Sequence, residues 1–264
     1  MRPPAVVAVT GAARGIGEAV ARTLSARGYR LLLGDLDDSV LTLAAELGAL
    51  GGQLDVTDQG SYERWLALVP RVDVLVNNAG VMWVGPYANE PEGVQRRQFD
   101  VNVHGVIRGT RLVLPAMRAR RSGLVVTVAS VASYVAPAGE ATYSATKHAV
   151  RGWMTGVRQE LRGSGVDLAL VHPAVVRTEL AAGTTSGAAA VLEPADVAVA
   201  VLAVIERPRF ETFVPARATA LTWLVTLLPQ RGRDLVYARL VPDQVRQSDP
   251  GARADYQARR LGQP

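Results

Sequence analysis

A glycine-rich turn, GAARGIG at 11–17, directly follows a short β-branched run, AVVAVT at 5–10. The next segment, 18–27, is amphipathic with a helical period, and a second apolar run follows at 29–34. This order predicts a strand, a tight turn, a helix and a second strand. Glycines let such a turn approach a pyrophosphate at the N-terminus of the helix, so the unit indicates a dinucleotide-binding site.

Apolar runs and amphipathic segments keep alternating along the chain. Further strands are expected at 52–56, 72–76, 124–129, 166–171 and 210–214. Further helices are expected at 61–69, at 92–119 with interruptions at Gly105 and Gly109, from about 141 to Leu161, and at 195–207. Strands that alternate with helices indicate an α/β fold of the Rossmann type, a doubly wound parallel β-sheet of about seven strands with helices on both faces.

No linker, repeat or charge block divides the chain, so we predict one domain. Residues 1–215 would carry the cofactor and catalytic sites, and 216–264 would extend the same domain as an apolar helix and a polar tail. The composition after Gly251 is compatible with disorder. Residues 216–228 are strongly apolar but too short to span a bilayer. Packing over a pocket or against another subunit is the favoured interpretation, and contact with a membrane surface is the alternative.

Composition excludes several classes of protein. The 264 residues include no cysteine, so disulfides and thiolate metal sites are impossible, and we predict no metal site. No apolar run of about 18 residues exists, and no leader precedes the first strand, so we expect a cytoplasmic protein. The net charge of +5 reflects mostly scattered arginines with few aromatic neighbours, so we expect no nucleic-acid partner.

Asp35 stands where the second strand should end. A carboxylate there would accept hydrogen bonds from the adenosine ribose hydroxyls and would repel a 2′-phosphate, which favours NAD over NADP. Arg14, inside the glycine-rich turn, argues weakly for NADP, because a guanidinium can pair with that phosphate.

Tyr143 and Lys147 lie four residues apart and therefore share one face of the expected helix. A nearby ammonium favours the phenolate, so we expect the pKa of Tyr143 to fall from its usual value of about 10. A general acid/base works best when its pKa lies near the working pH. Lys147 is also the only lysine in a chain that otherwise uses arginine, which indicates a specific need for a compact ammonium.

Six motifs, taken together, resemble the single-domain short-chain dehydrogenases/reductases over residues 5–215. They are TGAARGIG at 10–17, Asp55, NNAG at 77–80, Asn102, Ser130 and YSATK at 143–147. The resemblance implies a catalytic tetrad of Asn102, Ser130, Tyr143 and Lys147. Ser130 would hold the substrate oxygen, Tyr143 would move the proton, Lys147 would bind the nicotinamide ribose, and Asn102 would support a proton relay. The cofactor supplies the hydride chemistry.

The family pattern and the turn chemistry together give a set of expected cofactor contacts. They are Gly11, Arg14, Gly15, Ile16, Gly17, Asp35, Asp55, Val56, Asn78, Ala79, Gly80, Tyr143, Lys147, Pro173, Val176 and Thr178. Ala174 departs from the family, which usually has glycine there, so the local backbone path is open to question. Residues 181–190 are small and flexible in composition, which fits either a lid over the substrate or an ordinary loop.

The expected substrate is a neutral, hydrophobic alcohol or ketone. Residues expected near it are apolar or aromatic, namely Met82, Trp83, Tyr134, Val135 and Pro173. We also expect a homo-oligomer, a dimer or a tetramer. One alternative is an NADPH-dependent carbonyl reductase, which Arg14 supports. The other is a non-catalytic nucleotide-sensing or scaffold protein, which the complete tetrad disfavours.

Overall fold

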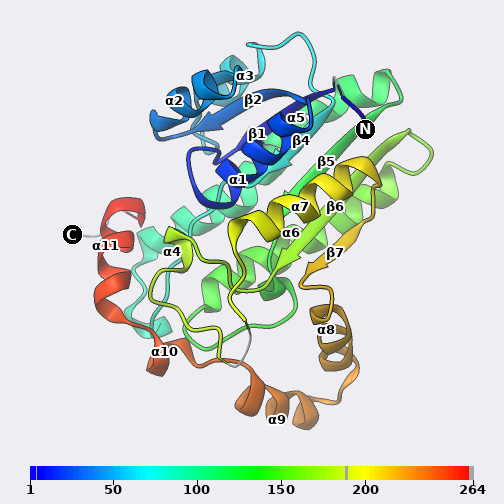
Figure 1. The fold of residues 1–264 in the computed structure, drawn as a ribbon. Helices are drawn as coiled ribbons and strands as arrows, with labels where there is room; N and C mark the ends of the chain where they lie inside the picture. The colour runs from blue at the N-terminus through cyan, green and yellow to red at the C-terminus, as the bar shows by residue number, and fades with distance from the viewer. Residues whose placement is uncertain (4, 188–189, 262–264) are drawn as a thin grey trace.

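A seven-stranded β-sheet forms the centre of the fold (Figure 1). The structure, a computed structural model, describes residues 1–3, 5–187 and 190–261, without the side chains of 220, 221, 223, 224 and 250. All strand pairs are parallel, in the order β3-β2-β1-β4-β5-β6-β7. The strands are β1 (Val6–Thr10), β2 (Arg30–Asp35), β3 (Leu50–Gln53), β4 (Val74–Asn77), β5 (Gly123–Val128), β6 (Val166–Pro173) and β7 (Glu211–Val214).

Helices cover both faces of this sheet, and each face has its own hydrophobic core. One face carries α1 (Gly15–Ala26), α2 (Ser39–Glu46) and α7 (Pro194–Glu206). The other carries α3 (Gln59–Leu66), α5 (Val106–Ala119) and α6 (Ala141–Glu160). Alternation along β1 shows why: Val7 and Val9 join the first core, whereas Ala8 between them joins the second. The predicted doubly wound α/β fold is confirmed.

Several predicted boundaries are wrong in detail. The third strand begins at Leu50, two residues before its expected start, and helix α2 was not predicted. The stretch 92–119 is continuous, because α4 (Glu92–Phe99) passes through a π-helical segment, Asp100–Gly105, into α5. Gly109 does not interrupt α5. A Cβ added there would lie 2.0 Å from the Tyr62 hydroxyl oxygen, so this glycine allows α3 to approach α5 closely.

After β7 the described chain is helical. The elements are α8 (Ala218–Leu227), α9 (Gln230–Leu240), α10 (Gln244–Gln247) and α11 (Pro250–Leu261). Helix α8 lies within the apolar segment 216–228. The tail after Gly251, whose composition is compatible with disorder, is helical as far as Leu261, and Arg253 of α11 donates to the carbonyl oxygen of Met82 in the segment after β4. Residues 262–264 lie outside the described residues. None of the described helices combines the length and apolar character that crossing a membrane requires.

Candidate active site

A cavity of about 910 Å³ opens at the carboxyl edge of the sheet, where ligands bind in folds of this type. Most of the expected cofactor and catalytic residues line it together. They are Gly11, Arg14, Gly15, Ile16, Asp35, Asp55, Val56, Asn78, Ala79, Gly80, Ser130, Tyr143, Lys147, Pro173, Val176 and Thr178. Gly17 and Asn102 lie behind this lining and act on it through other residues.

The glycine-rich turn is shaped for a close approach. Gly11 and Gly15 have φ values of 65° and 56°, which favour glycine. A Cβ on Gly15 would lie 3.3 Å from Thr178 Cγ2, across the cavity lining. Gly17 is packed so tightly that an added Cβ would lie 2.0 Å from the Gly11 carbonyl oxygen. The side chain of Asn78 stabilises the turn by donating to the carbonyls of Thr10 (3.0 Å) and Gly11 (2.9 Å). The cradle therefore fits a dinucleotide phosphate.

Asp35 is fixed by backbone donors at the end of β2. Its two carboxylate oxygens accept hydrogen bonds from the backbone N–H groups of Ala13 (2.9 Å) and Asp37 (3.0 Å). The Arg14 guanidinium pairs with Asp37 and with Glu179 (3.0 Å). It therefore does not take up the acceptor oxygens of Asp35. The carboxylate keeps acceptor capacity toward the cavity, whereas the arginine is already paired.

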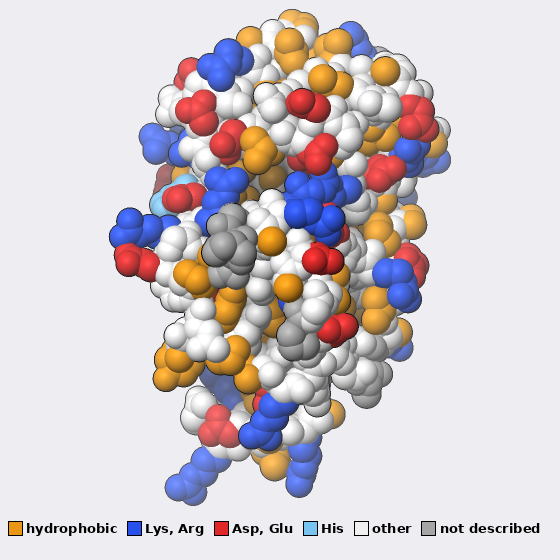
Figure 2. Space-filling view, turned by 90° about the vertical axis from the view of Figure 1, so that its left-hand side faces the viewer, with side chains coloured by type: hydrophobic (Ala, Val, Ile, Leu, Met, Phe, Trp, Pro, Cys, Tyr) orange, Lys and Arg blue, Asp and Glu red, His pale blue; other side chains and the backbone are white. Residues whose placement is uncertain are grey.

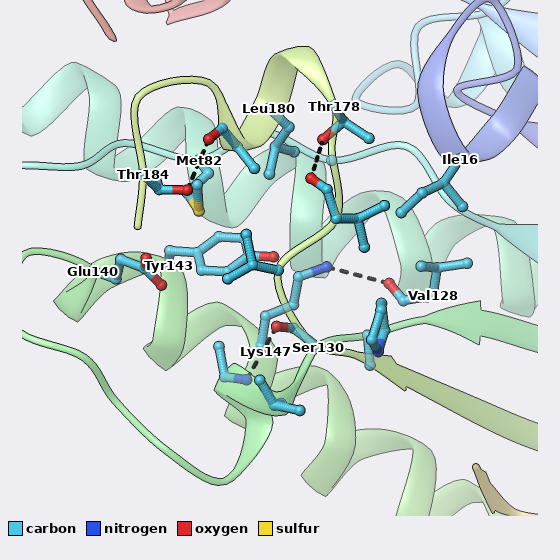
Figure 3. A pocket seen from close by; sticks show the side chains of 18 of the residues that line it. Ile16, Met82, Val128, Ser130, Glu140, Tyr143, Lys147, Thr178, Leu180 and Thr184 are labelled. Carbon is cyan, nitrogen blue, oxygen red and sulfur yellow. Dashed lines mark hydrogen bonds between the residues drawn. The ribbon is translucent and has the colours of Figure 1, made fainter. Parts of the chain in front are cut away.

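Tyr143, Lys147 and Ser130 point into the same part of the cavity (Figure 3). Tyr143 and Lys147 come from α6, and the Lys147 Nζ atom lies 5.5 Å from the centroid of the Tyr143 ring. The Lys147 ammonium donates to the Val128 carbonyl oxygen at 3.3 Å. Ser130 follows β5, accepts a hydrogen bond from the Ala132 N–H (3.0 Å), and hydrogen-bonds with Tyr143. A second serine nearby, Ser133, is buried and lies outside the lining.

Burial has the largest influence on the pKa values of Tyr143 and Lys147. It raises the pKa of Tyr143 well above its ordinary value, the charge of Glu140 adds to the rise, and the hydrogen bond with Ser130 opposes it. The prediction that the pKa of Tyr143 falls is therefore wrong for the site as it stands. Burial also lowers the pKa of Lys147 to about 8. Below pH 8 the lysine therefore keeps its positive charge while the phenol holds its proton.

Asn102 lies in the π-helical segment and is 1% exposed. Its side-chain amide donates to the Val81 carbonyl oxygen (2.8 Å) and to the Thr146 hydroxyl (3.1 Å), and its oxygen accepts from the Val81 N–H (2.9 Å). It therefore ties the chain after β4 to the residue that precedes Lys147. π-Helical turns of this kind are frequent at functional sites.

The expected substrate neighbours divide into two groups. Met82, Val135 and Pro173 line the cavity. Trp83 and Tyr134 do not, so those two expectations are wrong: Trp83 packs with Val94 and Leu261, and the Tyr134 hydroxyl donates to Glu211 at 2.7 Å. Met82 and Trp83, although adjacent in the sequence, belong to different hydrophobic clusters.

The question raised by Ala174 is resolved by the backbone. Ala174 is not among the residues of positive φ, so its methyl group causes no strain, and its N–H donates to the Val214 carbonyl oxygen at 2.8 Å. The chain therefore leaves β6 without requiring a glycine.

Part of the segment expected to be either a lid or an ordinary loop contacts the C-terminal segment. The guanidinium of Arg253 donates to the carbonyls of Leu180 (2.6 Å) and Ala182 (3.2 Å). Gln244 exchanges two hydrogen bonds with the backbone of Thr185. These contacts anchor 180–185, whereas residues 188–189 of the expected segment 181–190 lie outside the described residues.

Two parts of this site were missed from the sequence. One is Glu140, three residues before Tyr143, which is buried and lines the cavity. The other is the inner face of α11. Its residues 253, 256, 257, 260 and 261 recur with a helical period, which was a usable signal. The Tyr256 hydroxyl accepts from the Met82 N–H (3.2 Å), and Tyr256, Arg259, Arg260 and Leu261 line the cavity.

Comparisons with known proteins agree with this geometry. A family model described as short chain dehydrogenase matches residues 5–189. The chain is a short-chain dehydrogenase/reductase. Oxidoreductase UcpA of Salmonella typhimurium is 36% identical to it over 183 residues, which cover 66% of this chain and 70% of that protein. The chain is therefore an oxidoreductase of this family, whose members use NAD or NADP.

Solved structures of the family share the fold. A short-chain dehydrogenase/reductase from Burkholderia phymatum in complex with NAD superposes with a TM-score of 0.78 at 26% identity, over 93% of this chain and 97% of that one. The closed form of serine dehydrogenase complexed with NADP⁺ gives a TM-score of 0.73 at 29% identity, over 79% of this chain and 93% of that one. Both cofactors thus occur among the structural relatives of this enzyme.

Proposed function

We propose that this enzyme transfers a hydride between NAD and a neutral, hydrophobic alcohol or ketone, with Tyr143 as the general acid/base. The observation that carries the proposal is the convergence of a phenol, a hydroxyl and an ammonium on one wall of the cavity. Bound cofactor supplies the hydride chemistry. The protein's task is to position the substrate oxygen and to exchange one proton with it.

In the proposed mechanism, each tetrad residue has a distinct task. Ser130 holds the substrate oxygen beside the Tyr143 hydroxyl. During reduction, the phenol gives its proton to the oxygen of the carbonyl; during oxidation, the phenolate takes the proton of the alcohol. Lys147 supplies the positive charge that favours the phenolate, and Asn102 positions α6 through Thr146. Because burial raises the pKa of Tyr143, the phenol is protonated at neutral pH, which is the form that gives a proton during reduction.

NAD is the proposed cofactor because Asp35 lies at the end of β2 with its carboxylate fixed. A 2′-phosphate about 4 Å from that charge would be repelled by up to about 4 kcal/mol. Arg14 offers little compensation, since it already pairs with Asp37 and Glu179. One observation favours the second candidate, an NADPH-dependent carbonyl reductase: Arg14, Arg259 and Arg260 all line the cavity and could together attract a phosphate.

The rest of the proposal concerns what binds and where. Met82, Ala132 and Leu180 pack around Tyr143, and this apolar surface supports a hydrophobic substrate. We keep as predictions that the protein is a cytoplasmic homo-oligomer with one domain extended by 216–264. Packing by 216–228 remains preferred to membrane contact, since Thr222 and Val225 are buried within the monomer.

One experiment tests the function and the cofactor together. A panel of hydrophobic alcohols and ketones is assayed with NAD(H) and NADP(H) by nicotinamide absorbance. We expect Tyr143→Phe to lower kcat at least ~10²-fold, the scale of general acid/base assistance, while cofactor affinity stays within a few-fold. We also expect NAD to be preferred by ~10²-fold in kcat/KM, which corresponds to about 2.7 kcal/mol. Retained activity in Tyr143→Phe would refute the mechanism, and an equal or better kcat/KM with NADP(H) would refute the cofactor assignment.

A further inference from the structure

Glu140 is a buried carboxylate with no hydrogen-bond or ion-pair partner in the part of the chain that the structure describes. It stands directly before α6, is 8% exposed, and lines the cavity beside Tyr143 (Figure 3). Its side chain makes no capping hydrogen bond to the helix. Among residues 1–3, 5–187 and 190–261, no group forms a hydrogen bond or an ion pair with this carboxylate. Burying a carboxylate without such contacts costs stability, so its presence needs a reason outside the fold.

The charged groups around Glu140 show why it faces the cavity unpaired. Burial raises its pKa to about 7, and the positive charge of Arg253 opposes the rise. Arg253 forms no ion pair with it, because the guanidinium donates to the carbonyls of Leu180, Ala182 and Met82. The charge of Glu140 also acts on Tyr143, and Tyr256 acts on Tyr143 in turn. The carboxylate oxygens of Glu140 are therefore available to accept hydrogen bonds from a ligand that enters the cavity.

The Glu140 carboxylate lies apart from the Tyr143 hydroxyl, the group proposed to transfer the proton. Glu140 lies on one side of the Tyr143 ring, and Lys147 lies on the other, next to the Tyr143 hydroxyl (Figure 3). A substrate whose reacting oxygen meets Ser130 and the Tyr143 hydroxyl would thus extend along the ring toward Glu140. Met82 and Leu180 provide apolar surface along that path.

We propose that Glu140 is a specificity-determining residue that accepts a hydrogen bond from a second hydroxyl group of the substrate, remote from the carbon that reacts. The inference rests on the proposed function and narrows its substrate class to hydrophobic diols and hydroxyketones. A hydroxyl suits the position better than an ammonium does, because the charge of Arg253 acts on the same space and disfavours a second cation.

The test compares substrates that differ only in a second hydroxyl. Initial rates are measured with 2-hexanol and with 2,3-, 2,4- and 2,5-hexanediol, for the wild type and for Glu140→Leu and Glu140→Gln. The readout is the ratio of kcat/KM for each diol to kcat/KM for 2-hexanol, so general effects of a substitution cancel. A hydrogen bond to a charged acceptor contributes about 1.5–3 kcal/mol, so we expect at least one diol to be favoured by ~10-fold or more.

In Glu140→Leu this ratio should fall to about one, and Glu140→Gln, which keeps an acceptor of the same size, should retain part of it. Glu160→Leu removes an exposed carboxylate from the same helix and should leave the ratio unchanged. A wild type that favours no diol, or a diol advantage that survives in both Glu140 variants, would overturn the inference.

Failure of the proposed function looks different. Turnover that is absent with every alcohol, or that survives Tyr143→Phe, would refute the function and the inference with it. Turnover that depends on Tyr143 and is indifferent to Glu140 would refute the inference alone.

Discussion

The two walls of the active site are built in different ways. Ser130 and Lys147 belong to the wall carried by the sheet, where the ends of parallel strands fix the backbone: Ser130 follows β5, and Lys147 is tied to the last residue of that strand, Val128. The opposite wall is carried by α11, which no strand pairing holds. It depends on polar side chains: Arg253 donates to the Met82 carbonyl oxygen, and Arg260 pairs with Glu179. On the face of the molecule seen in Figure 2, Lys and Arg side chains lie next to Asp and Glu side chains.

The two walls therefore suit different tasks, proton transfer for one and closure of the cavity for the other. Proton transfer needs groups fixed to within fractions of an ångström, and residues on strands and buried helices meet that need better than peripheral helices do. Closure around the substrate and cofactor can instead be supplied by a helix held through a few removable contacts. The family model ends at 189, before any residue of α11.

The largest expected effect tests the sheet-borne wall. Lys147→Met should lower kcat/KM at least ~10²-fold, since the charge that assists proton transfer is lost. The same variant should be more stable than the wild type at pH 7. The folded pKa of about 8 lies below the ordinary 10.5, so the unfolded chain holds the proton more tightly, and burying the ammonium costs on the order of 3 kcal/mol below pH 8.

That stability difference should vanish as pH rises from 8 to 10.5, because the buried lysine is then neutral. Urea unfolding of both proteins at pH 7 and pH 10 measures it. Arg118→Met, which removes an exposed charge at the end of α5, is the control and should change neither activity nor stability. Equal stability of the wild type and Lys147→Met at pH 7 would contradict the argument.

An intermediate effect tests the wall carried by α11. Arg253 is 2% exposed and donates to Met82, Leu180 and Ala182. Arg253→Met leaves those carbonyls without donors, each at a cost of about 1–3 kcal/mol, and removal of a buried charge offsets part of this. We expect a net loss of about 2 kcal/mol, seen as a lower Tm, and faster hydrogen exchange within 250–261.

Activity sharpens the same test. If α11 serves closure alone, Arg253→Met should raise KM more than it lowers kcat. Arg246→Met is the matched control, because its side chain is 84% exposed and lies on α10. An unchanged Tm of Arg253→Met would show that other contacts hold α11 in place. A loss of kcat as large as that of Lys147→Met would show that the α11 wall contributes to proton transfer as much as the sheet wall does.

The two walls also differed in how far the sequence predicted them. β-Branched runs, the glycine-rich turn and the spacing of Tyr143 and Lys147 are local patterns, and they predicted the sheet and its wall of the site. Long-range contacts leave no such pattern: Arg253 looks like any helical arginine until Met82 and Leu180 are brought beside it. The pKa of Tyr143 was mispredicted for a related reason, since the depth of burial depends on the whole fold.

The smallest expected effect concerns a charged cluster that joins the two walls over the cavity. Arg14 pairs with Asp37 and Glu179, and Arg260 from α11 approaches the same two carboxylates, at 3.8 and 3.3 Å. These side chains are about one third exposed, so each pair contributes at most about 1 kcal/mol. Arg260→Gln should therefore speed cofactor release only ~2–5-fold, measured by stopped-flow displacement of bound NADH.

Salt provides the control for this last prediction, because screening weakens exposed pairs strongly at 1 M. The wild type in 1 M NaCl should release NADH about as fast as Arg260→Gln does in dilute buffer, and the variant itself should respond little. Arg246→Gln, outside the cluster, should behave as the wild type. If Arg260→Gln instead weakens NADP binding far more than NAD binding, the arginine contacts the 2′-phosphate. Both walls would then contribute to cofactor recognition: the sheet through Asp35, and α11 through Arg260.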